Sequence, residues 1–223
     1  GLQQSQEVLK IKDDIVNGCI SFKFGIGGLN LYARGYFCPS LIMDIVIGNC
    51  SRGRLVCKPK STTRPDFKYG FTKKGELVYI ESFYEGKKVS TEYILRENNA
   101  IIGFTFTDED VLVNYSREEY ENGRLIAYSL VFYDEMFGTA YSLHNETYNI
   151  NNARMTASLF DYEPKQGKLS SSCRGDYYCF DIDNEGYLTS YYPSENGIDP
   201  IDDRVYQAVP KRRCSVEQLC SER

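Results

Sequence analysis

Turn-forming residues recur at near-regular intervals after Phe67, and this recurrence constrains the fold more than any other feature. Clusters rich in Gly, Asn and Asp follow one another, mostly at intervals of roughly 12 residues. They occupy residues 73–75, 85–86, 97–99, 108–110, 121–123, 134–138, 149–152, 165–167 and 183–186. Between them lie β-rich runs such as 77–84, 101–107, 125–133 and 155–162. Short strands joined by such turns predict an all-β fold, an antiparallel meander.

The strands of this meander lack a purely polar face. In residues 125–133, Leu125 and Val131 point to one side, whereas Tyr128 and Leu130 point to the other. A curved sheet covered on both sides explains this pattern, as does an up-and-down barrel closed on itself. An exposed aromatic face is a third explanation, and it would then be a site for a partner.

The chain before the meander has a different pattern. Residues 5–17 predict a short helix, because Ser5 can cap it, apolar residues recur near helical spacing and Gly18 can end it. Strands are expected over 20–24, 29–37 and 41–47. We therefore divide the chain into a helix with strands packing on the main sheet (1–57), a linker-like loop (58–66), the meander (67–192) and an irregular tail (193–223).

Tyrosine dominates the aromatic composition, with 19 Tyr and 12 Phe but no Trp. Tyrosine suits a pleated surface because its ring packs while its hydroxyl reaches water, and it is also enriched in interface hot spots. The second property indicates a non-catalytic protein-binding module with a Tyr-rich β face, whose acidic turns would suit a basic partner. The candidate contact residues are Tyr115, Tyr120, Tyr128, Tyr133 and Tyr141.

One stretch of the meander carries a family resemblance. Residues 120–125 read Y-E-N-G-R-L and are followed by F-Y-D at 132–134, with weaker copies at 73–77, 84–87 and 184–188. Over about residues 67–192 the chain resembles Rhs-type YD-repeat proteins and MORN-like hairpin repeats. The resemblance implies a shell, a surface scaffold or an immunity or antitoxin-like partner, and it transfers no catalytic residue.

The cysteines and sequons bear on the compartment. The eight cysteines include no Cys-x-x-Cys pair, so the spacing typical of zinc sites is missing. Three close couples suit disulfides across loops: Cys50 with Cys57, Cys173 with Cys179, and Cys214 with Cys220. The N-x-S/T sequons at Asn49, Asn114 and Asn145 are compatible with secretion. We expect a secreted or cell-surface protein in preference to a cytoplasmic one. The alternative functions are a disulfide-stabilised barrel that binds a small apolar ligand and a structural surface protein.

Motifs for catalysis and cofactors are weak. His144, the single histidine, is expected on the surface near a turn, and the acidic clusters at 108–110 and 199–203 read as solvated turns rather than a hydrolase site. Asp181, Asp183 and Glu185 resemble the start of a calcium loop, but Tyr192 stands where a bidentate Glu is needed. No cofactor is expected. A net charge of −5 argues against nucleic-acid binding, and no apolar run is long enough for a transmembrane segment.

Overall fold

The computed structural model describes residues 2–27, 34–40, 42–43, 53–133, 140–151, 154–162, 176–182, 188–194 and 206–207. It contains one α-helix, α1 (Leu2–Asn17), and one 3-10 helix, η1 (Gly35–Phe37). The strands are β1 (Ser21–Ile26), β2 (Arg54–Val56), β3 (Phe67–Phe71), β4 (Leu77–Tyr84), β5 (Lys87–Glu97), β6 (Ala100–Phe106), β7 (Leu112–Glu121), β8 (Arg124–Tyr133), β9 (Ala140–Asn151), β10 (Arg154–Tyr162), β11 (Asp176–Ile182), β12 (Leu188–Ser194) and β13 (Tyr206–Gln207).

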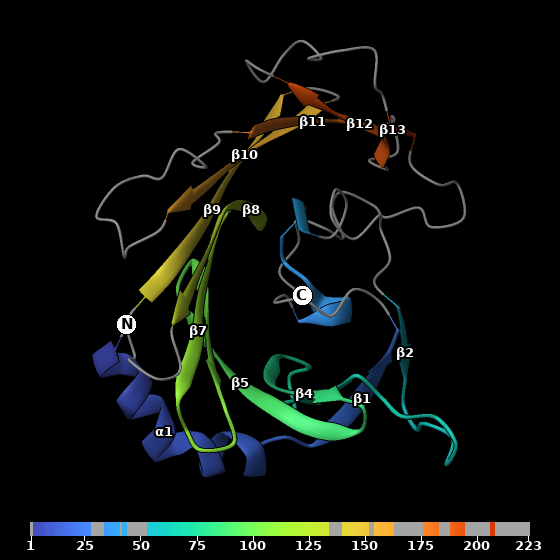
Figure 1. Ribbon diagram of the computed structural model, residues 1–223, viewed down its shortest axis with the longest axis vertical. Helices are drawn as coiled ribbons and strands as arrows, with labels where there is room; N and C mark the ends of the chain where they lie inside the picture. Colours follow the sequence, from blue (N-terminus) through green and yellow to red (C-terminus); the bar gives the residue numbers. More distant parts are fainter. Residues whose placement is uncertain are drawn as a thin grey trace.

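The strands form a single antiparallel meander, as the turn spacing predicts. The order across the sheet is β13-β12-β11-β10-β9-β8-β7-β6-β5-β4-β3-β1-β2. Consecutive strands from β3 to β13 therefore pair with one another, whereas β1 lies between β3 and β2. The two ends of this order, β13 and β2, do not pair with each other, and the sheet is curved and open rather than a closed barrel (Figure 1).

The turn residues adopt the backbone conformation that their identities favour. Asn122 and Gly123 both have positive φ, 51° and 75°, which is the requirement of the two-residue hairpin turn expected there. Glu85 and Gly86 do the same between β4 and β5, with φ of 51° and 81°. Such turns follow the right-handed twist of the flanking strands and therefore keep consecutive strands paired.

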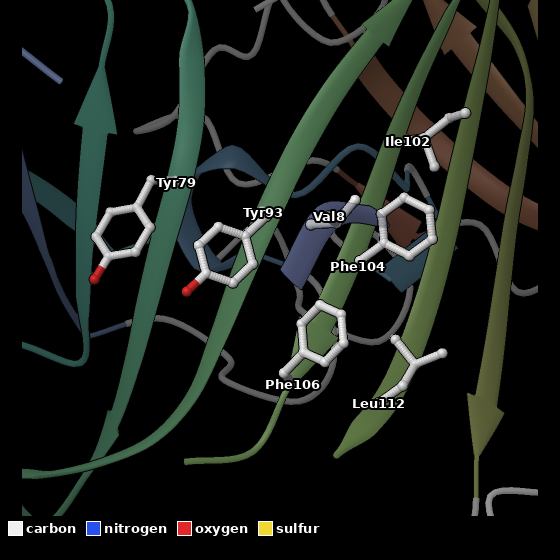
Figure 2. Packing of buried hydrophobic residues seen from close by; sticks show 7 residues of the cluster. All are labelled: Val8, Tyr79, Tyr93, Ile102, Phe104, Phe106 and Leu112. Carbon is white, nitrogen blue, oxygen red and sulfur yellow. The ribbon is translucent and has the colours of Figure 1, made fainter. Parts of the chain in front are cut away.

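One face of the sheet packs against α1. Val8 of the helix is buried among aromatic and aliphatic side chains of β4 to β7, as Figure 2 shows. The strand residues of this cluster are Tyr79, Tyr93, Ile102, Phe104, Phe106 and Leu112. The helix thus supplies the cover that one of the two apolar faces requires. In the described part of the chain, no helix is long and apolar enough to span a membrane.

The opposite face lies inside the curve of the sheet and is covered by residues 34–40 and 42–43, which we call the inner strap (Figure 1). Phe37 of η1 meets Tyr69 edge-on with ring centroids 4.8 Å apart, and Phe67 stacks on Tyr69 at 5.7 Å. Gly35 makes this approach feasible, since it has φ of 53° and a β-carbon there would overlap the ring of Phe67. The two-sided cover explains why neither face of the strands is polar.

The N-terminal third departs from the sequence-based expectation in two respects. A strand was expected over 29–37, but Gly35–Phe37 is a 3-10 helix because Arg34 and Gly35 have positive φ; most of 41–47 lies outside the described residues. The expected linker, 58–66, connects strands of one sheet, since β1 hydrogen-bonds to both β2 and β3. Residues 1–57 therefore contribute strands to the main sheet as well as the helix that packs on it.

Candidate functional site

The tyrosines predicted to form one contact face are divided between the two faces of the sheet. Tyr115 and Tyr133 pack against the cluster beneath α1, whereas Tyr120 packs against the cluster beneath the inner strap. Tyr128 is only 1% exposed, so the prediction that it forms part of a contact surface is wrong. The side chain of Tyr141 lies outside the described residues. A continuous Tyr-rich surface is therefore not formed by the described members of this set.

The strongest concentration of ionisable groups lies between the sheet and the inner strap. Arg34 donates from Nε to Oε1 of Glu92 on β5 at 2.8 Å and from Nη2 to Oγ of Ser116 on β7 at 3.1 Å. Its Nη1 pairs with Glu118, also on β7. The side chain of Arg34 is 7% exposed and that of Glu118 is 4% exposed, so this charge cluster is shielded from water.

Burial and ion pairing shift the pKa values of these groups in opposite directions. Burial raises the pKa of Glu92, and the positive charge of Arg34 opposes the shift. For Arg34, burial alone would lower the pKa, but the carboxylates of Glu92 and Glu118 outweigh burial and raise it. One guanidinium therefore faces two carboxylates, and the arginine stays charged at every physiological pH.

A second buried cluster centres on Glu146 of β9. Its carboxylate accepts a hydrogen bond from Oγ of Ser40 at 2.5 Å and contacts Nε2 of His144 and the hydroxyl of Tyr148. His144 is 5% exposed in the middle of a strand, so the expectation of a surface histidine near a turn is wrong. His144 and Glu146, two residues apart on β9, are buried polar residues because they bond to one another and, through Glu146, to Ser40 of the inner strap.

This second cluster contains Ser, His and Glu but lacks the geometry of a catalytic triad. In a triad the imidazole accepts the proton of the nucleophile, whereas here the hydroxyl of Ser40 and the imidazole of His144 both face the same carboxylate. Ser40 also accepts a hydrogen bond from the backbone N–H of Met43 at 2.9 Å. These contacts hold the inner strap on the sheet.

The space beside the Arg34 cluster is too small for a substrate. The cavity lined by Arg34, Phe37, Glu118 and Tyr120 has a volume of about 20 Å³, which is enough for roughly one water molecule. A ligand pocket usually encloses several hundred Å³. The cavity beside the Arg34 cluster thus has no room for the small apolar ligand that a barrel would bind.

The predicted disulfide and calcium residues lie partly outside the described residues. No disulfide joins any two of the four described cysteines, which are Cys19, Cys38, Cys57 and Cys179. The proposed partners of Cys57 and Cys179, together with Cys214 and Cys220, fall outside the described ranges. Of the calcium candidates, Asp183 and Glu185 also fall outside, and Asp181 accepts a hydrogen bond from Oγ of Ser190 at 2.8 Å. No group of three metal-ligating side chains occurs in the described ranges.

Exposed basic and apolar side chains lie at one end of the sheet, where the loop after β2 meets the hairpin between β4 and β5. Nη1 of Arg64 donates to the backbone carbonyl of Glu85 at 3.1 Å, and the backbone N–H of Phe83 donates to the carbonyl of Asp66 at 2.8 Å. The carboxylate of Asp66 in turn accepts from the N–H of Gly27 at 2.7 Å. The end of the loop, at Arg64 and Asp66, thus packs against the hairpin. We call residues 54–66 and 84–89 together the loop–hairpin surface; the loop is teal at the lower right of Figure 1.

The loop–hairpin surface combines positive charge with exposed apolar side chains. Tyr84 is 66% exposed and Val89 is 47% exposed, although both are large hydrophobic residues. The surface also carries six exposed basic residues, Arg54, Lys58, Lys60, Arg64, Lys87 and Lys88, against two acidic ones, Asp66 and Glu85. Of these, Lys88 pairs with Asp108 at 3.0 Å on the neighbouring turn.

A shallow hollow of about 360 Å³ lies at the opposite end of the sheet, near the β5–β6 and β7–β8 turns. Its charged groups already pair with one another, since Arg117 contacts Glu119 at 2.8 Å and Glu97 at 3.8 Å. The remaining lining residues are polar turn residues and the partly exposed Ile126. This end of the sheet serves below as the reference surface for tests of the loop–hairpin surface.

Comparison with known proteins assigns no family: no protein-family model matches the chain, and no curated protein is found to be related to it. The resemblance to YD and MORN-like repeats thus stays a hypothesis based on the residues themselves.

The sequence did not point to the residues that define the buried Arg34 cluster or the exposed part of the loop–hairpin surface. Arg34, Glu92 and Glu118 were not singled out, although charged side chains at inward positions of apolar strands are an available signal. Tyr84 and Val89 flank the Glu85-Gly86 turn that was recognised, and large apolar residues beside a tight turn are a signal of exposure.

Proposed function

We propose that this chain is a non-catalytic protein-binding module and that the loop–hairpin surface contacts the partner. The observation that carries the proposal is that Tyr84 and Val89 are both exposed on one hairpin, which also carries Lys87 and contacts Arg64. Aromatic and arginine side chains are enriched in the energetically dominant parts of protein interfaces. Two large apolar side chains exposed on one hairpin are a feature typical of an interaction site.

The two buried clusters fit a structural role, so the contact site is sought on the surface of the protein. Each carboxylate of the Arg34 and Glu146 clusters contacts donors from the protein itself. The cavity beside the Arg34 cluster holds roughly one water molecule. The clusters attach the inner strap to the sheet, as expected of a structural role.

The test is capture of binding proteins from extract of the source cells by three immobilised forms of the chain. The first is the unmodified chain, the second carries Tyr84→Ser and Val89→Ser, and the third carries Ile126→Ser at the opposite end of the sheet. The proposal predicts a protein retained by the first and third forms and lost from the second. If the Tyr84 and Val89 changes leave every retained protein in place, the loop–hairpin surface is not the contact site.

A further inference from the structure

We infer that the occupant of the loop–hairpin surface is an extended acidic segment of the partner protein, in which carboxylates alternate with apolar side chains. The inference rests on the proposed function and specifies the chemistry of the partner. It differs from the expectation of a basic partner, which came from the acidic turns and not from the surface that exposes apolar groups.

The positive charge of the loop–hairpin surface supports an acidic occupant. The loop–hairpin surface carries an excess of four positive charges, whereas the whole chain has a net charge of −5. A local charge opposite in sign to that of the molecule is a feature that steers and orients a complementary partner. One of these charges is also held in place, since Arg64 is bonded to the hairpin backbone and its side chain lies over Gly86.

The placement of the apolar side chains supports an extended peptide as the occupant. Tyr84 and Lys87 are paired across the β4–β5 hairpin, and Val89 follows Lys88 directly along β5. A ligand that satisfies this surface must offer both carboxylates and apolar groups at short spacing. An extended peptide does so naturally, because its successive side chains alternate in direction.

The surroundings argue against a nucleic acid or a membrane as the occupant. The acidic turn that contains Asp108 and Asp110 adjoins the surface, with Asp108 only 3.0 Å from Lys88 and Asp110 paired with Lys12. A long polyanion would extend past the basic residues towards these carboxylates and the net negative remainder of the chain. A short acidic segment fits within the basic area.

The test is fluorescence anisotropy with a labelled peptide in which glutamate alternates with leucine, and with a control peptide that has lysine in place of glutamate. The full chain is compared with a double variant, Lys60→Glu and Lys87→Glu, and with a matched double variant, Lys73→Glu and Lys74→Glu. The matched pair applies the same change of charge at the exposed β3–β4 turn, at the other end of the sheet.

The inference predicts that the acidic peptide binds, that the lysine peptide does not, and that the Lys60/Lys87 variant raises Kd by roughly tenfold or more while the matched variant changes it less than about threefold. Equal effects of the two double variants would overturn it. So would tighter binding of single-stranded RNA or of anionic vesicles than of the acidic peptide.

Failure here is distinguishable from failure of the proposed function. If the acidic peptide does not bind but capture of a partner still depends on Tyr84 and Val89, the surface is a contact site and only the assigned chemistry of the occupant is wrong. If capture is also independent of Tyr84 and Val89, the proposed function itself is wrong.

Discussion

Gly103 on β6 lies directly against the carboxylate of Glu92 on β5, and a β-carbon at Gly103 would overlap Oε1 of Glu92. The same β-carbon would lie 2.5 Å from Oγ of Ser116 and 2.7 Å from Nη2 of Arg34. A glycine in the middle of a central strand normally weakens the sheet, but here it creates the space in which the charge cluster forms. The absence of a side chain at one position thus allows the inner strap to bond to the sheet.

The variant Gly103→Ala should destabilise the fold strongly, because the added methyl group must displace the Arg34–Glu92 pair. We expect a loss of about 3 kcal/mol in the free energy of unfolding, measured by urea denaturation. As a control, Gly75→Ala lies in a turn with φ of 82° and with no atom near the added carbon, and should lose only about 1 kcal/mol. A smaller loss at position 103 than at position 75 would contradict the role assigned to Gly103.

Removal of Arg34 should be more harmful than removal of the whole charge cluster. Arg34→Met leaves Glu92 and Glu118 buried without their cation, which is expected to lower stability by about 3 to 5 kcal/mol. A triple variant that adds Glu92→Gln and Glu118→Gln removes the buried charges and should recover part of this loss. The comparison is made by urea denaturation, and a triple variant no more stable than Arg34→Met would show that charge is not the cause.

Glu92 should make the protein more stable on mild acidification. Burial raises the pKa of Glu92 in the folded state, so the folded protein takes up this proton at a higher pH than the unfolded chain does. The stability that depends on Glu92 therefore increases as the pH falls from neutrality towards the unfolded pKa of about 4.3. Unfolding measurements across this range should show the unmodified chain gaining stability relative to Glu92→Gln. A constant or opposite difference would contradict the assignment.

The cysteines should differ in reactivity in the folded protein. Cys57 is exposed and forms no disulfide with a described cysteine, whereas Cys38 is buried beside the backbone carbonyl of Ser40. Iodoacetamide should therefore modify Cys57 in native buffer and Cys38 only after unfolding, as peptide mass spectrometry would show. If Cys57 reacts only after reduction, it is oxidised, and the expected disulfide with Cys50 and an oxidising compartment gain support.

The sequence predicts the meander well because its information is local. The turns at Glu85-Gly86 and Asn122-Gly123 require positive φ, and residue types that tolerate it mark them directly. The apolar character of both strand faces left three explanations open, and the structure shows that the first of them, cover on both sides, is correct for β3 to β7. The identity of the inner cover could not be predicted, because the inner strap reaches Glu92 and Glu118 from positions 58 and 84 residues away in the chain.

The candidate site was harder to predict than the fold for the same reason. Tyr128 and Tyr84 are the same residue type on similar strands, yet one is 1% exposed and the other is 66% exposed. Only tertiary packing distinguishes them. Tyr128 packs against the ring of His144, whereas Tyr84 is the last residue of β4, at the hairpin end of the sheet. Aromatic composition therefore indicates a binding capacity without locating it.

The most direct test of the central claim is site-specific photo-crosslinking to the captured partner. A benzophenone side chain is placed at Tyr84 in one form of the chain and at Ile126, at the opposite end of the sheet, in another. If the loop–hairpin surface contacts the partner, irradiation should give a covalent adduct from position 84 and none from position 126. An adduct from position 126 alone would place the partner at the opposite end of the sheet and would contradict binding at the loop–hairpin surface.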